Sequence, residues 1–178
     1  MNIVLTGFMA SGKTTVGRRI TELSDYEFID TDEMIVEREG RSINDIFAAD
    51  GEEYFRRVER EVIREAAKLD NKVISTGGGV VLNPENIEEL RKNGIVFNLD
   101  PDFPVIEQRV TRAAQTRPLM QNQSIEDIKK RFDDRKPLYD NCDYKIHITE
   151  QSTPSSSAKR ILEIITNART IHEGNNTD

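Results

Sequence analysis

Cysteine and tryptophan are the scarcest residue types in this chain of 178 residues. Tryptophan is absent, and the one cysteine, Cys142, cannot form a disulfide within the chain. Such chains are typical of reducing compartments. No apolar run approaches the roughly 18–20 residues of a membrane-spanning helix, and residues 1–7 read as a strand and a turn rather than a secretion signal. The sequence therefore predicts a cytoplasmic protein with no membrane partner.

Basic residues are also fewer than acidic residues. The chain has 25 Lys and Arg residues against 32 Asp and Glu residues, for a net charge of −7. Duplex binding usually needs a basic face, so nucleic acid is not an expected partner. A local basic pocket could still concentrate small anions. The two histidines, His147 and His172, show no metal-ligand spacing and are assigned, with Cys142, to packing or surface.

The order of strand-like and helix-like segments predicts one α/β domain over residues 1–171, with a disordered tail at 172–178. The alternation indicates a parallel sheet with helices on both faces, and such sheets bind ligands at the carboxyl ends of their strands. The expected strands are 2–6, 27–29, 72–75, 95–99 and 144–148. The expected helices are 13–23, 32–38, 42–49, 52–69, one from Pro84 to Gly94, 104–111, 124–136 and 154–170.

Residues 112–123 are polar, contain a proline and show no clear period, so we expect a mobile loop there. With its flanks, this loop would form a lid over about residues 111–124. Arg117 lies in it and could swing onto a transferring phosphate, although most loop arginines are simply solvated. The same reservation applies to Arg135, near the end of the helix expected at 124–136.

Residues 7–14 match the P-loop pattern G-x-x-x-x-G-K-[ST], between an expected strand and an expected helix. Backbone N–H groups of such a loop point at phosphate oxygens, and the helix offers its positive end to the same anion. Lys13 would supply a charge to the β- and γ-phosphates, and Thr14 a hydroxyl ligand for Mg²⁺. The alternative is a purely structural turn. The residues expected to bind ATP are Ala10, Ser11, Gly12, Lys13, Thr14 and Thr15.

Two carboxylates, Asp30 and Asp32, follow the second expected strand. Two residues apart in an extended segment, they point the same way. One could hold the shell of the metal while the other faces a substrate hydroxyl. The alternative is that Asp32 only caps the following helix, and capping and catalysis can coexist.

Arg56 and Arg57 lie near the start of a long expected helix, where cations oppose the helix dipole. Either nearby glutamates compensate them (Glu52, Glu53 and Glu59), or one arginine forks onto a substrate carboxylate. Three glycines, Gly77, Gly78 and Gly79, follow the third strand. They indicate either close backbone approach to a ligand or a tight turn.

Together these segments resemble the shikimate kinase family over residues 2–170. The resemblance rests on GFMASGKTT from Gly7, FIDTD from Phe28, FRRVE from Phe55, TGGG from Thr76, RPL from Arg117 and RKPLY from Arg135. It implies a P-loop kinase with a five-stranded parallel sheet of order 2-3-1-4-5. It also implies transfer of the ATP γ-phosphoryl group to the 3-hydroxyl of shikimate, with Mg²⁺.

The resemblance also implies roles for single residues. Thr14 would bind the metal, and Asp30 would assist through the metal's water shell. Asp32 would bind the shikimate hydroxyls and act as the base. Arg56 and Arg135 would hold the shikimate carboxylate, with a backbone contact from Gly78, and Arg117 would close onto ATP.

One departure concerns the adenine site, because some family members carry an arginine after the last strand. Residues 149–154 contain none, so no adenine contact is assigned. The rival hypotheses are a gluconate or nucleotide kinase of the same fold, a nucleotide-sensing module without catalysis, and a family member that has lost turnover. A monomer is expected.

Overall fold

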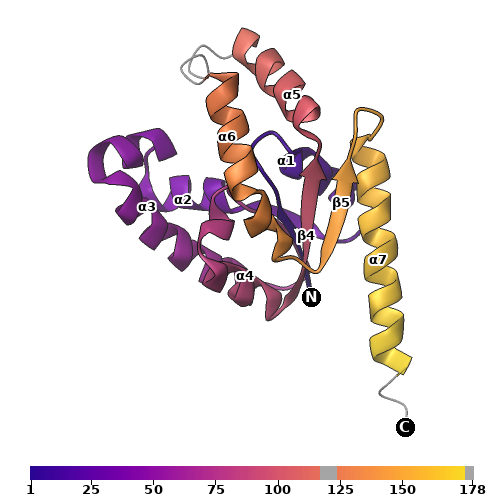
Figure 1. Ribbon diagram of the computed structural model, residues 1–178. Helices are drawn as coiled ribbons and strands as arrows, with labels where there is room; N and C mark the ends of the chain where they lie inside the picture. The colour runs from indigo at the N-terminus through magenta and orange to yellow at the C-terminus, as the bar shows by residue number, and fades with distance from the viewer. Residues whose placement is uncertain (117–123, 175–178) are drawn as a thin grey trace.

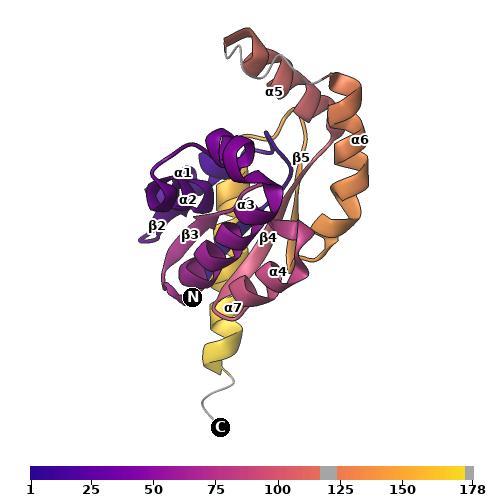
Figure 2. The same cartoon turned by 90° about the vertical axis from the view of Figure 1, so that its left-hand side faces the viewer.

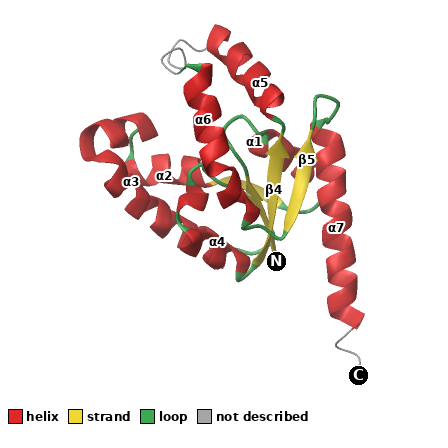
Figure 3. Cartoon of the chain, viewed as in Figure 1, coloured by secondary structure: helices red, strands yellow, loops and turns green. Residues whose placement is uncertain are grey.

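The protein is described here as a computed structural model that covers residues 1–116 and 124–174. Its centre is a five-stranded parallel sheet in the order β2-β3-β1-β4-β5, which confirms the expected topology. Figures 1 and 3 show two neighbouring strands of this sheet, β4 and β5. The strands are β1 (Asn2–Thr6), β2 (Glu27–Asp30), β3 (Lys72–Ser75), β4 (Gly94–Pro101) and β5 (Tyr144–Ile148). The central strand β1 is buried along its whole length, as expected for a sheet covered on both faces.

Helices cover both faces of the sheet. On one face lie α1 (Lys13–Glu22) and α7 (Pro154–Gly174), which pack Ile20 and Ile161 against Ile3 and Leu5 of β1. On the other face lie α3 (Ile43–Lys68) and α4 (Pro84–Arg91), followed along the chain by α5 (Phe103–Thr116) and α6 (Ile125–Arg135). Figure 2 shows α5 and α6 beside the carboxyl ends of the strands. Helices α5 and α6 therefore border the edge at which parallel sheets bind ligands.

Helix α2 (Thr31–Glu39) and the first half of α3 form a small lobe beside the sheet, visible at the left of Figure 1. Gly40 ends α2 with φ 65°, and the Ser42 hydroxyl accepts a hydrogen bond from the Asp45 N–H to begin α3. The predicted turn at Gly51 is present as a kink with φ 80°, so the two predicted helices continue into one another. Ile35, Ile46 and Phe55 fill the core of the lobe.

The loop predicted at residues 112–123 is wrong over its first part, because α5 continues to Thr116. The segment after Val110 contains Arg112 and Ala113, which are good helix formers, so propensity extends the helix beyond its clear apolar period. The final helix also runs past Thr170 to Gly174. The rest of the predicted lid, including Arg117, lies outside the described residues.

The described part of the chain also contains two short 3₁₀ helices, η1 (Val80–Leu82) and η3 (Lys136–Asp140). Within residues 1–116 and 124–174, no helix is both long and apolar enough to cross a membrane. His147 is exposed on β5 and lies 3.5 Å from Asp102, and the Cys142 thiol is half-buried. Both positions agree with packing or surface roles.

Candidate active site

Three polar segments meet at the carboxyl-end edge of the sheet. The P-loop (residues 7–14) follows β1, the two aspartates Asp30 and Asp32 lie where β2 passes into α2, and the triple glycine follows β3. These three strands are neighbours in the order β2-β3-β1, so their ends bring the segments together. The site is therefore built by topology from segments about 70 residues apart in the chain.

The P-loop backbone is curled as the motif requires. Ala10 and Gly12 have φ values of 59° and 101°, and Gly12 is the residue before α1. A side chain at Gly7 would place its Cβ 2.6 Å from the Ser11 Oγ and 2.8 Å from the Leu99 carbonyl oxygen, so only glycine fits. The loop thus forms a cradle that opens onto the N-terminus of α1, where an anion is favoured.

Lys13 folds back over this cradle. Its Nζ donates hydrogen bonds to the carbonyl oxygens of Gly7 at 2.8 Å and Phe8 at 3.2 Å. Burial lowers the pKa of Lys13 to about 8, while the charges of Asp32 and Asp30 act in the opposite direction. The ammonium group is therefore desolvated, so it would interact strongly with a phosphate that replaced these carbonyl contacts.

Asp30, and not Asp32, caps helix α2. Its Oδ1 accepts a hydrogen bond from the Asp32 N–H at 2.9 Å, which corrects the alternative that Asp32 is the cap. The second carboxylate oxygen of Asp30 lies 3.5 Å from the Thr14 Oγ1, which donates to it. A hydroxyl and a carboxylate thus face each other beside the P-loop, while the Asp32 carboxylate is left for another task.

The Asp32 carboxyl has a strongly shifted pKa. Burial, then the negative charges of Asp30 and Glu59, raise its pKa from 3.8 to about 6, and Lys13 and Arg56 offset part of this shift. A carboxylate with a pKa near 6 is a better proton acceptor than an ordinary one and is still ionised at neutral pH. Perturbed carboxyl groups of this kind cluster at functional sites.

Arg56 projects from α3 toward the triple glycine. Its Nη1 lies 2.8 Å from Glu59 and its Nη2 lies 3.3 Å from Glu52, so the compensating ion pairs expected for this arginine are present. Glu59 is only 2% exposed, and burial raises its pKa while Arg56 and Arg135 lower it. The guanidinium is therefore anchored from one side by carboxylates, which leaves its geometry fixed for a ligand.

The triple glycine is a turn that packs against the side chains of Asp32 and Arg56. The Gly77 N–H donates to the Thr31 Oγ1 at 3.2 Å, and the Gly77 carbonyl accepts from the Val80 N–H. A Cβ on Gly77 would lie 2.6 Å from the Asp32 Oδ1, and one on Gly79 would lie 2.5 Å from the Arg56 Nη2. The tight turn is confirmed, and its backbone approaches the Asp32 and Arg56 side chains closely, while approach to a ligand stays a prediction.

Arg135 ends α6, where its charge lowers the pKa of the buried Glu59. The charges of Arg56 and Arg135 therefore act on the same carboxylate. Arg117, the third predicted arginine, lies outside the described residues, so its place in the site stays a prediction.

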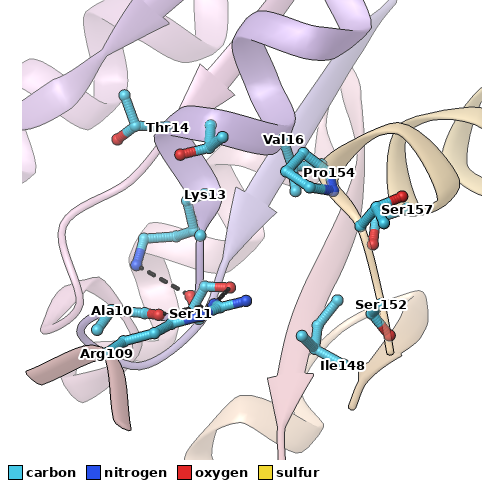
Figure 4. Close-up of a pocket in the computed structure, with 13 residues that line it drawn as sticks. Ala10, Ser11, Lys13, Thr14, Val16, Arg109, Ile148, Ser152, Pro154 and Ser157 are labelled. Carbon is cyan, nitrogen blue, oxygen red and sulfur yellow. Dashed lines mark hydrogen bonds between the residues drawn. The ribbon is translucent and has the colours of Figure 1, made fainter. Parts of the chain in front are cut away.

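A cavity of about 460 Å³ lies beside the P-loop and extends to the segment that follows β5 (Figure 4). Arg109 of α5 lines it and donates from Nη1 to the carbonyl oxygens of Ala10 at 2.9 Å and Ser11 at 2.8 Å. The predicted residues in its wall are Ala10, Ser11, Gly12, Lys13, Thr14 and Thr15. The residues that sequence analysis did not assign are Val16, Arg109, Ile148, Ser152, Thr153, Pro154 and Ser157.

One signal could have identified part of this wall. Residues 148–154 follow a strand at the same edge of the sheet as the P-loop, where parallel sheets bind ligands. No comparable signal marks Arg109, which is one of two arginines on α5.

Known proteins match the chain over nearly its full length. A family model described as shikimate kinase matches residues 9–166. The shikimate kinase of Caldicellulosiruptor bescii is 47% identical over 164 residues, which are 92% of this chain and 94% of that relative. The solved shikimate kinase of Acinetobacter baumannii, in complex with shikimate, is 36% identical with a TM-score of 0.83, covering 94% of this chain and 93% of that one.

The solved shikimate kinase of Aquifex aeolicus is 34% identical with a TM-score of 0.78, and 96% of this chain and 99% of that chain are covered. A match of this identity and coverage, together with the confirmed strand order and P-loop, identifies the family. This chain belongs to the shikimate kinase family of ATP-dependent phosphotransferases.

Proposed function

We propose that this chain transfers the γ-phosphoryl group of ATP to the 3-hydroxyl of shikimate, through the residues at the carboxyl-end edge of its sheet. The observation that carries the residue roles is that Asp32, whose pKa is raised, lies close enough to both the P-loop lysine and Arg56 for their charges to act on it. A phosphate cradle, a base and a carboxylate anchor therefore share one site. Phosphoryl transfer depends mainly on such positioning and charge stabilisation.

ATP would occupy the cavity beside the P-loop, with its phosphates on the cradle and its base toward residues 148–154. Arg109 and Pro154 give the cavity a planar cation and an apolar ring, and both surfaces suit a heteroaromatic base. The cavity therefore contains an arginine although none follows β5, because α5 supplies Arg109 to it.

The residues present fit a Mg²⁺ ion. Mg²⁺ prefers oxygen ligands and usually takes one or two from the protein, with water and substrate phosphates supplying the rest. Thr14 and Asp30 offer a hydroxyl and a carboxylate oxygen 3.5 Å apart beside the cradle, and the described residues contain no larger cluster of metal ligands. Bound there, the ion would neutralise charge on the β- and γ-phosphates.

The reaction assigned to these residues is a single displacement at the γ-phosphorus of ATP. The shikimate 3-hydroxyl loses its proton to the Asp32 carboxylate while its oxygen forms a bond to the γ-phosphorus. The bond between that phosphorus and the oxygen bridging it to ADP breaks, and ADP leaves with the bonding electron pair. Lys13, and Arg117 by expectation, would stabilise the charge on the transferring group.

Arg56 and Arg135 would hold the shikimate carboxylate, with the triple glycine as the backbone wall. We expect Arg56→Lys to raise the KM for shikimate by roughly 10- to 100-fold, because an ammonium cannot replace a bidentate fork. The KM for ATP should change less than twofold. Steady-state kinetics with each substrate varied in turn measures both values.

Arg57→Lys is the matched control for this prediction. The guanidinium of Arg57 lies over the Tyr54 ring, 4.9 Å from the ring centroid, whereas the arginine against Gly79 is Arg56. It should leave both KM values unchanged. Equal increases for shikimate and ATP in the Arg56 variant would show a structural arginine instead.

Arg109→Gln tests the nucleotide site. We expect the KM for ATP to rise by roughly 5- to 20-fold, since the substitution removes a cation from the base and a double hydrogen bond from the P-loop. The KM for shikimate should stay within twofold. Arg160→Gln, on the exposed side of α7, is the control. If Arg109→Gln kept the wild-type KM for ATP, the base of ATP would bind elsewhere.

The product tests the proposed function itself. With shikimate, ATP and Mg²⁺, ³¹P NMR should show a new phosphate monoester whose phosphorus couples to the proton on carbon 3 of the ring. Coupling to another ring proton would refute the assigned hydroxyl. A monomer and a cytoplasmic location remain predictions.

A further inference from the structure

Tyr139 is a buried tyrosine of η3 that none of the roles above uses. It is 6% exposed, and its ring packs in the core cluster that includes Phe8, Val80 and Phe132. Its hydroxyl donates a hydrogen bond of 2.5 Å to the carbonyl oxygen of Gly78. A tyrosine four residues after Arg135 thus reaches into the middle of the triple glycine.

Gly78 lies between Tyr139, which binds its carbonyl oxygen, and the P-loop. On one side is the Tyr139 hydroxyl, whose pKa burial raises to about 12, so that it keeps its proton and remains a donor at working pH. On the other side is the P-loop, where a Cβ on Gly78 would lie 3.5 Å from the Met9 nitrogen and 3.7 Å from the Gly7 oxygen. The glycine turn is therefore fixed between the phosphate cradle and the segment that carries Arg135.

Fixing this carbonyl also fixes the direction of the next N–H. The Gly78 C=O and the Gly79 N–H belong to one planar trans peptide, so they point in opposite directions. Among the described residues, the N–H groups of Gly78 and Gly79 have no hydrogen-bond partner, whereas the Gly77 N–H is taken by Thr31. Gly79 also lies directly against the Arg56 guanidinium.

We propose that Tyr139 is a positioning residue, whose hydroxyl orients the Gly78–Gly79 peptide so that the Gly79 N–H joins Arg56 and Arg135 as a further donor to the acceptor's carboxylate. The inference rests on the proposed function, because it assumes that a carboxylate binds at Arg56. An oriented backbone N–H beside a guanidinium gives the charge-assisted contacts that favour such an anion.

Tyr139→Phe is the direct test, because it removes the hydroxyl and keeps the buried ring. We expect the KM for shikimate to rise by roughly 3- to 10-fold, the effect of one hydrogen bond, with kcat and the KM for ATP within twofold. Tyr144→Phe is the matched control, since Tyr144 is 41% exposed on β5, and it should change none of these values. An unchanged KM for shikimate, or equal increases for both substrates, would overturn the proposal.

A spectroscopic measurement separates positioning from general loosening. In ¹⁵N-labelled protein without ligand, Tyr139→Phe should move the Gly79 amide signal, while the signals of Gly40 and Gly51 in the distant lobe stay in place. Addition of shikimate should shift the Gly79 signal less than in the wild type. A Gly79 signal at its wild-type position would overturn the proposal even if the KM changed.

Failure of the proposed function and failure of the inference about Tyr139 would give different results. A wild-type chain without turnover of shikimate would refute the proposed function, whereas the ligand-free Gly79 signal would still report whether Tyr139 orients the peptide. An active wild type with an unchanged Tyr139→Phe variant would refute this inference alone. Thermal unfolding of the variant, monitored by circular dichroism, should show a folded chain, because the ring keeps its apolar contacts.

Discussion

Asp32→Asn should lower kcat by roughly 10²- to 10⁴-fold, the usual contribution of a general base, while the chain remains folded. The amide has nearly the shape of the carboxyl group but cannot accept the proton of the acceptor hydroxyl. Steady-state ADP release, with both substrates saturating, measures the loss. A kcat within threefold of the wild type would refute the role of Asp32 as the base.

The pH dependence follows from the same carboxyl group. Its pKa is raised to about 6, so the base is ionised above that pH and protonated below it. We expect kcat/KM of the wild type to fall about tenfold per pH unit below pH 6, and Asp32→Asn to lose this limb of the profile. Asp133→Asn, an exposed carboxylate of α6 paired with Lys129, is the control and should keep the limb.

As the pH rises, the stability of the folded chain should change in the opposite direction to the activity. Because the pKa of Asp32 is higher in the folded chain than the ordinary 3.8, folding favours the protonated carboxyl, and the native state loses stability as the pH rises through about 6. Asn cannot ionise. The melting temperature of Asp32→Asn at pH 7 should therefore equal or exceed that of the wild type.

Lys13→Met should lower kcat by roughly 10²- to 10³-fold, which is the cost of removing one preorganised donor from a developing charge. The ammonium group is half-buried at the cradle, and burial lowers its pKa to about 8, so water screens it less than it screens a surface lysine. The same burial means that the charge costs folding free energy at neutral pH, so the variant should not melt below the wild type.

Lys92→Met is the control for this variant, because Lys92 is an exposed residue at the end of α4. It should retain wild-type kcat and KM values. If Lys13→Met kept more than a third of the wild-type kcat, the phosphates would not lie on the P-loop. A large drop in its melting temperature would instead mean that the carbonyl contacts of Lys13 hold the loop together.

The sequence predicted the sheet well because its signals are local. Each strand is a short β-branched or apolar run, and the turns that position the P-loop and end α2 depend on Gly12 and Gly40, whose positive φ values glycine tolerates. The helix caps at Ser42 and Ser124 can likewise be recognised in the sequence, because an aspartate follows each serine three residues later, at Asp45 and Asp127. Such features need no knowledge of the tertiary fold.

The features that the sequence did not predict depend on distant contacts. Arg109 reaches the P-loop across 98 residues of chain, and Tyr139 reaches Gly78 across 61. The raised pKa of Asp32 arises from burial and from Glu59 on another helix. Choosing Asp30 over Asp32 as the cap also required the geometry, because both residues favour that position.

The central claim is that this edge of the sheet phosphorylates shikimate, and a coupled ADP-release assay with ATP and Mg²⁺ tests it most directly. Shikimate, gluconate and a nucleoside monophosphate would be compared as acceptors at equal concentration. We predict turnover with shikimate alone. ADP release with gluconate or the nucleotide, and none with shikimate, would contradict the assigned acceptor site and leave only the P-loop chemistry.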